Sequence, residues 1–183
     1  MARLPYLEKS DLAPEHQSLL ARDINLHKVL AHNPAAARAF SGLGQYLRHG
    51  TALDPRLREL AILQVGWMAR SPYEWSHHVK IGYDFGVTDA DIDALIAESR
   101  GETSALEPLA RLVLRAAREA YAGPGIAPGT FAELAQSLDP PRLMDVVLTA
   151  AFYCAVVRVL ASLEVDVEDS YRPYLEKYPL PRD

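Results

Sequence analysis

Several features that identify large classes of proteins are scarce in this sequence. Cys154 is the single cysteine among 183 residues, which excludes an intramolecular disulfide. Basic residues are outnumbered, with 19 Lys and Arg against 24 Asp and Glu, and the net charge is -5. Nucleic-acid-binding domains usually carry a basic surface. We therefore expect no nucleic-acid partner.

Long apolar runs are also scarce. The N-terminal residues MARLPYLEKSDLAPEH have no apolar core of the kind found in signal peptides. The most apolar stretch, 146–163, is interrupted by Arg158 and is too short and mixed to predict a membrane span. These features predict a soluble, cytoplasmic protein with no membrane partner.

Strand signals are nearly missing, and helix signals are plentiful. Few segments alternate apolar and polar residues, and the sequence has no Asn-Gly or Asp-Gly hairpin turn. Alanine, leucine, arginine and glutamate, which favour helices, are abundant. The prediction is an all-α fold in one domain over residues 1–183. We expect a helical core at 34–163 and a C-terminal arm at 165–183.

Helix starts are marked by a capping side chain followed by proline, which fits the first helical position because its N–H is not needed there. Asn33-Pro34, Asp54-Pro55, Ser71-Pro72 and Asp139-Pro140 have this pattern. Thr88 with Asp91, and Ser104 with Glu107, resemble capping boxes. The predicted helices run from 34 to about 49, 55 to about 70, 72 to about 85, 88 to about 98, 104 to about 122, 129 to 136, and 140 to about 163.

The C-terminal arm (165–183) carries Tyr171, Tyr174 and Tyr178 among charged residues and prolines. Aromatic residues near a chain end often hold that end against a folded surface. The arm is expected either to pack on its own domain or to wrap a neighbouring subunit.

The segment 56–95 is the most informative part of the sequence. Two helices meet at Ser71-Pro72 with almost no loop, which brings their ends together. On the second helix, Ser71, Glu74 and His78 share one face, while His77 and His78 lie about 60° and 40° to either side of Glu74. Glu74 can therefore contact either imidazole. A Glu–His pair at this spacing is either a proton-transfer unit or an ordinary surface ion pair.

This segment resembles the carboxymuconolactone decarboxylase family, which includes the alkylhydroperoxidase D-like proteins. Peroxidase members have a glutamate, then Cys-x-x-Cys, then a histidine, and that spacing matches Glu59, positions 71 and 74, and His78. The flanking sequences RELAIL at 58–63, HVKIG at 78–82 and GVTDADI at 86–92 are similar too. The resemblance covers about 40 residues and implies an alkylhydroperoxidase D-like helical bundle.

The sequence departs from the peroxidase pattern at the two cysteine positions. Ser71 and Glu74 stand there, and neither can form a thiolate or a disulfide. Cys154 lies on a different, apolar helix and is interpreted as a small buried hydrophobic residue. We therefore expect no thiol peroxidase activity. The sequence is more similar to the cysteine-free members, some of which are decarboxylases.

The resemblance implies a lyase, or a related acid–base enzyme, that acts on a small carboxylated or lactone substrate without a metal or an organic cofactor. His78 would donate the proton, Glu74 would orient it, and Glu59 would be a second carboxylate in the relay. His77 is the alternative to His78 in this role, or it contacts a neighbouring subunit. Arg58 or Arg56 would hold a substrate carboxylate, unless both are surface charges. The residues expected to contact substrate are Ser71, Tyr73, Trp75, His77 and Arg58. The aromatic residues among them, with Trp67, have core packing as an alternative role.

Three other functions stay open from the residues alone. The site can be catalytically silent on an oligomer that binds a small molecule or a protein. A metal site would need Glu74, His78 and His77 plus a further ligand. A hydrolase with Ser71 as nucleophile and His78 as base is disfavoured, because seven residues of helix rise by about 10.5 Å.

A homo-oligomer is also expected. The family forms trimers or hexamers, and the hairpin contains more apolar residues than one small bundle needs for its core. The residues that suggest this are Val65, Trp67, Met68, Tyr73 and Trp75.

Overall fold

The computed structural model describes residues 2–181, and these form helices joined by short loops, with no strand. This confirms the all-α prediction. The elements are η1 (Lys9–Asp11), η2 (Pro14–Leu20), α1 (Asn25–Leu30), α2 (Pro34–His49), α3 (Pro55–Met68), α4 (Pro72–Asp84), α5 (Asp89–Ser99), α6 (Pro108–Ala122), α7 (Pro128–Ser137), α8 (Pro140–Leu163), η3 (Asp169–Tyr171) and α9 (Arg172–Lys177).

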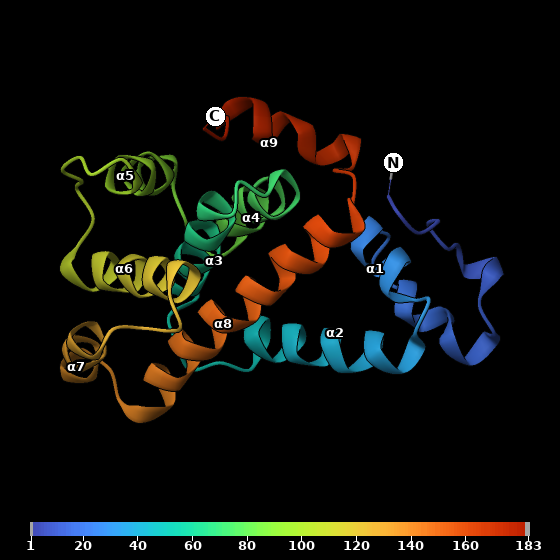
Figure 1. Cartoon of the computed structure of the whole chain (residues 1–183), viewed down its shortest axis with the longest axis horizontal. Helices are drawn as coiled ribbons and strands as arrows, with labels where there is room; N and C mark the ends of the chain where they lie inside the picture. Colours follow the sequence, from blue (N-terminus) through green and yellow to red (C-terminus); the bar gives the residue numbers. More distant parts are fainter. Residues whose placement is uncertain (1, 182–183) are drawn as a thin grey trace.

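The α3–α4 hairpin lies at the centre of the fold (Figure 1). α3 contacts α4, α6 and α8, and it is buried on nearly every side. In Figure 1, α5, α6 and α7 lie on one side of the hairpin, and α1 and α2 lie on the other, with α8 crossing between them. A helix covered all round carries apolar residues on all its faces, and the buried polar exceptions on α3 are Arg58, Glu59 and Gln64.

The capping residues act as predicted at five helix starts. The side chains of Asn33, Asp54, Ser71 and Asp139 each accept a hydrogen bond from a backbone N–H in the first turn, and Thr88 forms a capping box with Asp91. The predicted box at Ser104 is wrong. α6 begins at Pro108, and the Ser104 hydroxyl donates to Glu98 of α5 instead.

Two residues allow α3 and α4 to pack closely. Arg70 has a φ of 47°, a left-handed conformation that reverses the chain between the helices. Gly66 faces α4 so closely that a Cβ there would lie 3.3 Å from the backbone nitrogen of Trp75. The hairpin is thus tight enough for side chains of α3 to bond side chains of α4.

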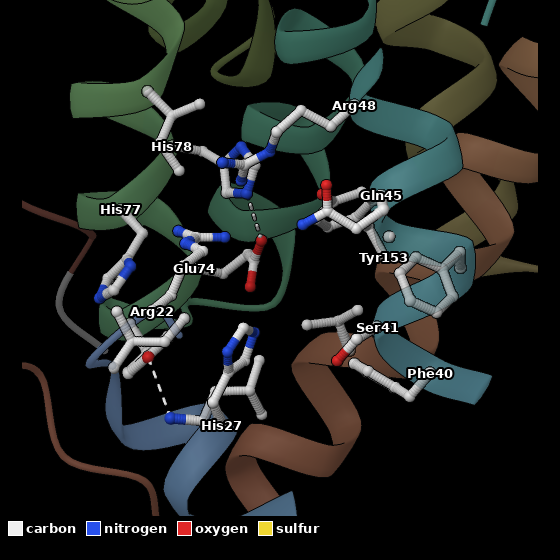
Figure 2. Close-up of a pocket in the computed structure, with 17 residues that line it drawn as sticks. Arg22, His27, Phe40, Ser41, Gln45, Arg48, Glu74, His77, His78 and Tyr153 are labelled. Atoms are coloured by element: carbon white, nitrogen blue, oxygen red, sulfur yellow. Dashed lines mark hydrogen bonds and ion pairs between the residues drawn. The ribbon is translucent and has the colours of Figure 1, made fainter. Parts of the chain in front are cut away.

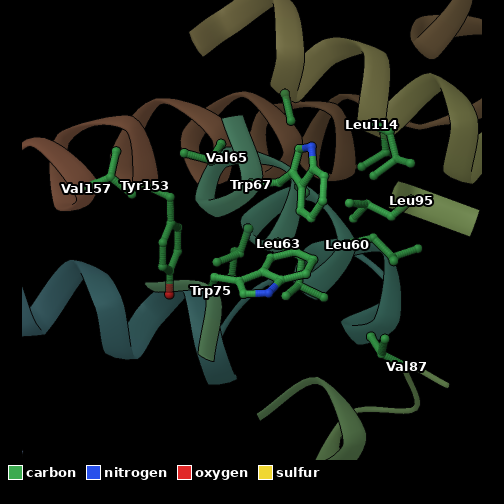
Figure 3. Close-up of a cluster of buried hydrophobic side chains, with 14 of the residues drawn as sticks. Leu60, Leu63, Val65, Trp67, Trp75, Val87, Leu95, Leu114, Tyr153 and Val157 are labelled. Carbon is green, nitrogen blue, oxygen red and sulfur yellow. The ribbon is translucent and has the colours of Figure 1, made fainter. Parts of the chain in front are cut away.

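The hydrophobic core surrounds this hairpin. Figure 3 shows the indole rings of Trp67 and Trp75 packed among leucine and valine side chains, and their centroids are 5.2 Å apart. Trp75 is fully buried, and its Nε1–H donates to the carbonyl of Tyr178 at 2.7 Å. Val65, Trp67 and Tyr73 are also buried within their own chain, so this apolar surface is used in the core and does not indicate an oligomer.

The described part of the C-terminal arm folds back on its own chain. It contains η3 and α9, and α9 packs on α4. Tyr178 is buried in the core cluster. The last residues of the predicted arm, 182–183, lie outside the described residues.

α8 is the one helix among the described residues that is long and apolar enough to cross a membrane, judged by length and composition alone. Core helices of soluble proteins pass the same test. In this fold α8 packs against α3 and α6.

Candidate active site

The hairpin brings Glu59 of α3 beside His78 of α4. The distance from His78 Nδ1 to Glu59 Oε2 is 2.6 Å. On the other side of the ring, His78 Nε2 lies 3.0 Å from Oε1 of Glu74, one helical turn earlier on α4. An imidazole that bonds carboxylates through both nitrogens donates both hydrogens, as the imidazolium does. The three side chains form a Glu59–His78–Glu74 relay.

Burial and charge act in opposite directions on the relay. Burial works against the charged imidazolium, but Glu59 and Glu74 outweigh it and raise the pKa of His78 to about 9. Burial also works against the Glu59 carboxylate, yet His78 and Arg58 hold the pKa of Glu59 below its ordinary value. His78 is therefore protonated and Glu59 is ionised at neutral pH.

Arg58 neutralises the buried end of the relay. Its Nη2–H donates to Glu59 Oε1 at 2.9 Å, and its Nη1–H donates to the backbone carbonyl of Arg48 at 3.0 Å. The guanidinium carbon lies 4.4 Å from the centre of the Phe85 ring. Arg58 and Glu59 are both almost fully buried. The Arg58 guanidinium thus supports Glu59 and is not free to bind a substrate.

His77 points to a different set of partners. Its ring stacks between Tyr73 and Tyr171, with centroid distances of 4.1 Å and 3.5 Å, and its Nε2 lies 2.6 Å from Glu168 Oε2. The Tyr73 hydroxyl donates to the other oxygen of Glu168 at 3.0 Å. Burial lowers the pKa of His77, and Glu168 only partly offsets this.

A pocket opens in front of Glu74 and His78 (Figure 2). Its cavity volume is about 80 Å³, and it is enclosed by α2, α4, α8 and the segment that leads into α1. Tyr153 of α8 packs edge-on against His78, with the ring centroids 5.1 Å apart. The pocket wall is partly apolar, and Glu74 is the one acidic residue among the described residues that line it.

Glu74 is the part of the relay that reaches the pocket with a free atom. Oε1 bonds His78, whereas no residue of the segment 2–181 bonds Oε2. Glu59 does not line the pocket and is linked to it only through His78. The arrangement can therefore store a proton on His78 and present a carboxylate to a bound molecule.

The predicted site residues separate into two groups. Glu74, His77, His78 and Tyr73 line the pocket. Ser71, Trp75 and Arg58 do not line it: Ser71 caps α4, Trp75 lies in the core, and Arg58 bonds Glu59. The expectation that these three contact a substrate in this pocket is therefore corrected. Arg56 is also outside it, paired with Asp91 and Glu107.

Sequence reasoning missed more than half of the pocket wall. Arg22 and His27 come from the N-terminal segment, for which no element had been predicted. Phe40, Ser41, Gln45 and Arg48 come from α2, and Phe152, Tyr153 and Val156 come from α8. One signal was available: Ser41, Gln45 and Arg48 are spaced four and three residues apart, which places them on one face of α2.

The same side chains are not arranged as a metal site. Within residues 2–181, no group of three or more His, Cys, Asp and Glu side chains is arranged to hold a metal ion. Both nitrogens of His78 bond carboxylates, and His77 turns to Glu168.

Comparisons with known structures agree with this architecture. The chain superposes on a peroxidase-related protein with an alkylhydroperoxidase AhpD core from Ralstonia eutropha JMP134, with a TM-score of 0.80, 19% identity and 95% of each chain covered. A peroxidase-related protein from Silicibacter sp. TM1040 gives a TM-score of 0.70 at 19% identity, covering 85% of this chain and 82% of that one.

A third similar structure is the debrominase Bmp8, a cysteine-to-alanine variant in complex with 2,3,4-tribromopyrrole. Its TM-score is 0.77 at 19% identity, with 97% of this chain and 99% of that chain covered. At these identities the structures establish a shared fold and leave the reaction open. No curated protein matches the sequence.

The family assignment comes from the sequence itself. Residues 34–119 match the model of the carboxymuconolactone decarboxylase family. This range contains α3, α4 and the whole Glu59–His78–Glu74 relay. This match supports the carboxymuconolactone decarboxylase family for the segment that contains the relay, and the superpositions establish an alkylhydroperoxidase D-like fold.

Proposed function

We propose that this protein is a cofactor-independent lyase, or a related acid–base enzyme, that acts on a small carboxylated or lactone substrate. The observation that carries the proposal is the relay: His78 lies between Glu59 at 2.6 Å and Glu74 at 3.0 Å, and Glu74 faces a pocket. A general acid or base contributes about 10²–10⁴-fold to a rate when it reaches the proton that it transfers.

In a decarboxylation, the bond between the substrate carbon and its carboxylate breaks and CO2 leaves. The electron pair stays on the substrate as a dienolate, which then takes a proton at carbon. The proton comes from the Glu74–His78 pair, and solvent restores it. Burial, together with the nearby carboxylates of Glu74 and Glu59, raises the pKa of Tyr153, so its hydroxyl stays protonated and can donate to the dienolate oxygen.

Thiol peroxidase chemistry does not fit this chain. The family's cysteine positions hold Ser71 and Glu74, and Cys154 lies on α8, where burial raises the pKa of its thiol. A peroxidase needs a reactive thiolate with a second thiol to resolve the intermediate. Glu74 takes the position of one thiol and supplies a carboxylate instead.

A catalytically silent binding protein is the second candidate. It is favoured by the same hydrogen bonds, because both nitrogens of His78 are occupied within the chain and Arg58 completes a neutral, buried cluster. In that case the relay is a structural element, and the pocket binds a ligand without changing it.

We also propose a cytoplasmic homo-oligomer, most simply a trimer or a hexamer. Support comes from α8, where Met144, Leu148, Ala151 and Ala155 form an apolar stripe that this chain leaves exposed or partly exposed. Multi-angle light scattering should return three or six times the monomer mass. A monomer at micromolar concentration would contradict the assembly.

The function is tested with a panel of small carboxylated lactones incubated in D2O. NMR would follow deuterium entering the substrate carbon, and a coupled assay would follow CO2. We expect turnover by the wild type and a loss of at least about 100-fold in Glu74→Gln and His78→Gln. Arg142→Gln, on the exposed start of α8, is the matched control and should keep the wild-type rate. Equal rates for the wild type and His78→Gln would show that the relay takes no part in catalysis.

A further inference from the structure

Two arginines face the pocket without a hydrogen-bond or ion-pair partner for their guanidinium groups among residues 2–181. Arg22 and Arg48 both line it, and both are partly buried. No described carboxylate forms an ion pair with either guanidinium, although Arg56 and Arg58 on the neighbouring α3 are both paired. Partly buried arginines without an anion are costly, because the charge loses water and gains nothing in return.

The charges around the pocket do not cancel. The imidazolium of His78 balances Glu74, and Arg58 balances Glu59. The positive charges of Arg22 and Arg48 remain. Burial, and then repulsion from Arg48, lowers the pKa of Arg22, but a guanidinium stays protonated in proteins. The pocket lining therefore carries a net positive charge from Arg22 and Arg48.

His27 adds an unsatisfied polar atom at the same place. Its Nδ1 is buried and has no hydrogen-bond partner among the described residues. Burial, with the charges of Arg22 and Arg48, lowers the pKa of His27 to about 4, so the ring is neutral at physiological pH. A neutral imidazole can donate one hydrogen bond without adding a third positive charge. In Figure 2, Arg22, Arg48 and His27 surround the space in front of Glu74.

We propose that Arg22 and Arg48 form an anion subsite that holds the carboxylate of a small organic acid, with the apolar body of the acid against Phe40, Phe152 and Val156. A guanidinium binds a carboxylate through two parallel hydrogen bonds, and this geometry fixes orientation as well as charge. The bound acid is placed with its carboxylate at the arginines and the rest of the molecule beside Glu74.

The cavity volume limits the size of this acid. At about 80 Å³ the cavity is smaller than the roughly 150 Å³ that holds benzene in an apolar protein cavity. The enclosed part of the ligand is therefore a short or branched acid, and a larger molecule would extend through the opening. The inference rests on the proposed function only for the role of Glu74, since the subsite binds anions whether or not a reaction follows.

The test measures the binding of isobutyrate by ligand-observed NMR. Isobutyramide, a neutral molecule of the same shape, is the control ligand. We expect the wild type to bind isobutyrate with a millimolar Kd and to bind isobutyramide at least tenfold more weakly. Arg22→Gln and Arg48→Gln should each weaken isobutyrate binding about tenfold or more. Arg22→Lys and Arg48→Lys keep the positive charge, so isobutyrate affinity should fall less in these variants than in the glutamine variants. Arg142→Gln is the control with an exposed arginine removed, and circular dichroism checks that each variant is folded.

The outcomes separate this inference from the proposed function. Glu74→Gln should keep or strengthen isobutyrate binding, because it removes the negative charge from the pocket, while it stops proton transfer. Equal binding of isobutyrate and isobutyramide, or unchanged binding in folded Arg22→Gln and Arg48→Gln, would overturn the subsite and leave the relay untouched. Arginine-dependent binding without turnover of any lactone would support the subsite and contradict the lyase.

Discussion

His77 and His78 are neighbours on α4, and their surroundings give them opposite properties. His78 lies between two carboxylates, and its pKa rises to about 9. His77 lies between two aromatic rings with one half-buried carboxylate, and burial lowers its pKa. Both rings are buried to a similar degree. The number of carboxylates within hydrogen-bond distance, and not burial, decides which histidine carries a proton at neutral pH.

The two histidines also serve different parts of the chain. His78 joins α3 to α4 and connects the interior to the pocket. His77 joins α4 to the C-terminal arm through Glu168 and Tyr171. A candidate chemical group and a group that holds the arm in place are thus consecutive residues on one helix.

The strongest test of the contrast is to remove each imidazole in turn. His78→Gln should reduce deuterium incorporation into a lactone substrate by about 10²–10⁴-fold, which corresponds to about 3–5 kcal/mol of barrier. His77→Gln should change the rate less than tenfold. Similar losses in both variants would mean that the two histidines are not functionally distinct.

Removing the buried carboxylate should affect stability most. Glu59→Gln leaves the charges of His78 and Arg58 buried beside a neutral amide, and we expect a loss of about 3–5 kcal/mol in the free energy of unfolding. Glu168→Gln, at the half-buried partner of His77, should cost less. Urea denaturation of both variants measures the difference. Equal losses in the free energy of unfolding would show that the deeper burial of Glu59 does not make its charge more important for stability than that of Glu168.

The pH dependence of stability should differ in sign between the two histidines. The pKa of His78 is raised, so its contribution is complete below about pH 6.5 and disappears as the pH rises through about 9. The pKa of His77 is lowered, so its contribution is present above the ordinary value of 6.5 and is lost as the pH falls below it. The free energy of unfolding is measured from pH 4 to 10. Its pH dependence should differ from that of the wild type at the alkaline end in His78→Gln and at the acidic end in His77→Gln. A change at the acidic end in His78→Gln and at the alkaline end in His77→Gln would contradict the pKa directions given for both histidines.

The smallest effect is expected at the arm. Tyr171→Ala removes the ring that stacks on His77 at 3.5 Å and should cost about 1 kcal/mol. Hydrogen exchange of residues 168–178 should become faster, while exchange of α3 stays as it was. Uniform exchange across the chain would mean that the arm does not open separately.

Much of the fold follows from local chemistry that a sequence displays. The caps at Asn33, Asp54 and Ser71, each followed by proline, predicted the starts of α2, α3 and α4 because capping depends on neighbouring residues only. The predicted helix start at Ser104 was wrong for the same reason. A local pattern suggested a cap, but the hydroxyl found a partner on another helix.

The site was only half predictable. Glu59, Glu74 and His78 lie within one hairpin, so helix spacing and family resemblance were enough to group them. Arg22, Arg48 and Glu168 lie outside the hairpin, and the packing of their segments against it decides their positions. Arg58 illustrates the limit: its charge suggested a ligand, whereas its burial beside Glu59 assigns it a partner within the protein.

The central claim is that two carboxylates keep His78 protonated at neutral pH, and nitrogen NMR of 15N-labelled imidazoles tests it most directly. Titration from pH 5 to 10 should show both nitrogens of His78 protonated at pH 7, with an apparent pKa near 9 that falls towards 6.5 in Glu59→Gln. A His78 that is already neutral at pH 7 in the wild type would contradict the relay.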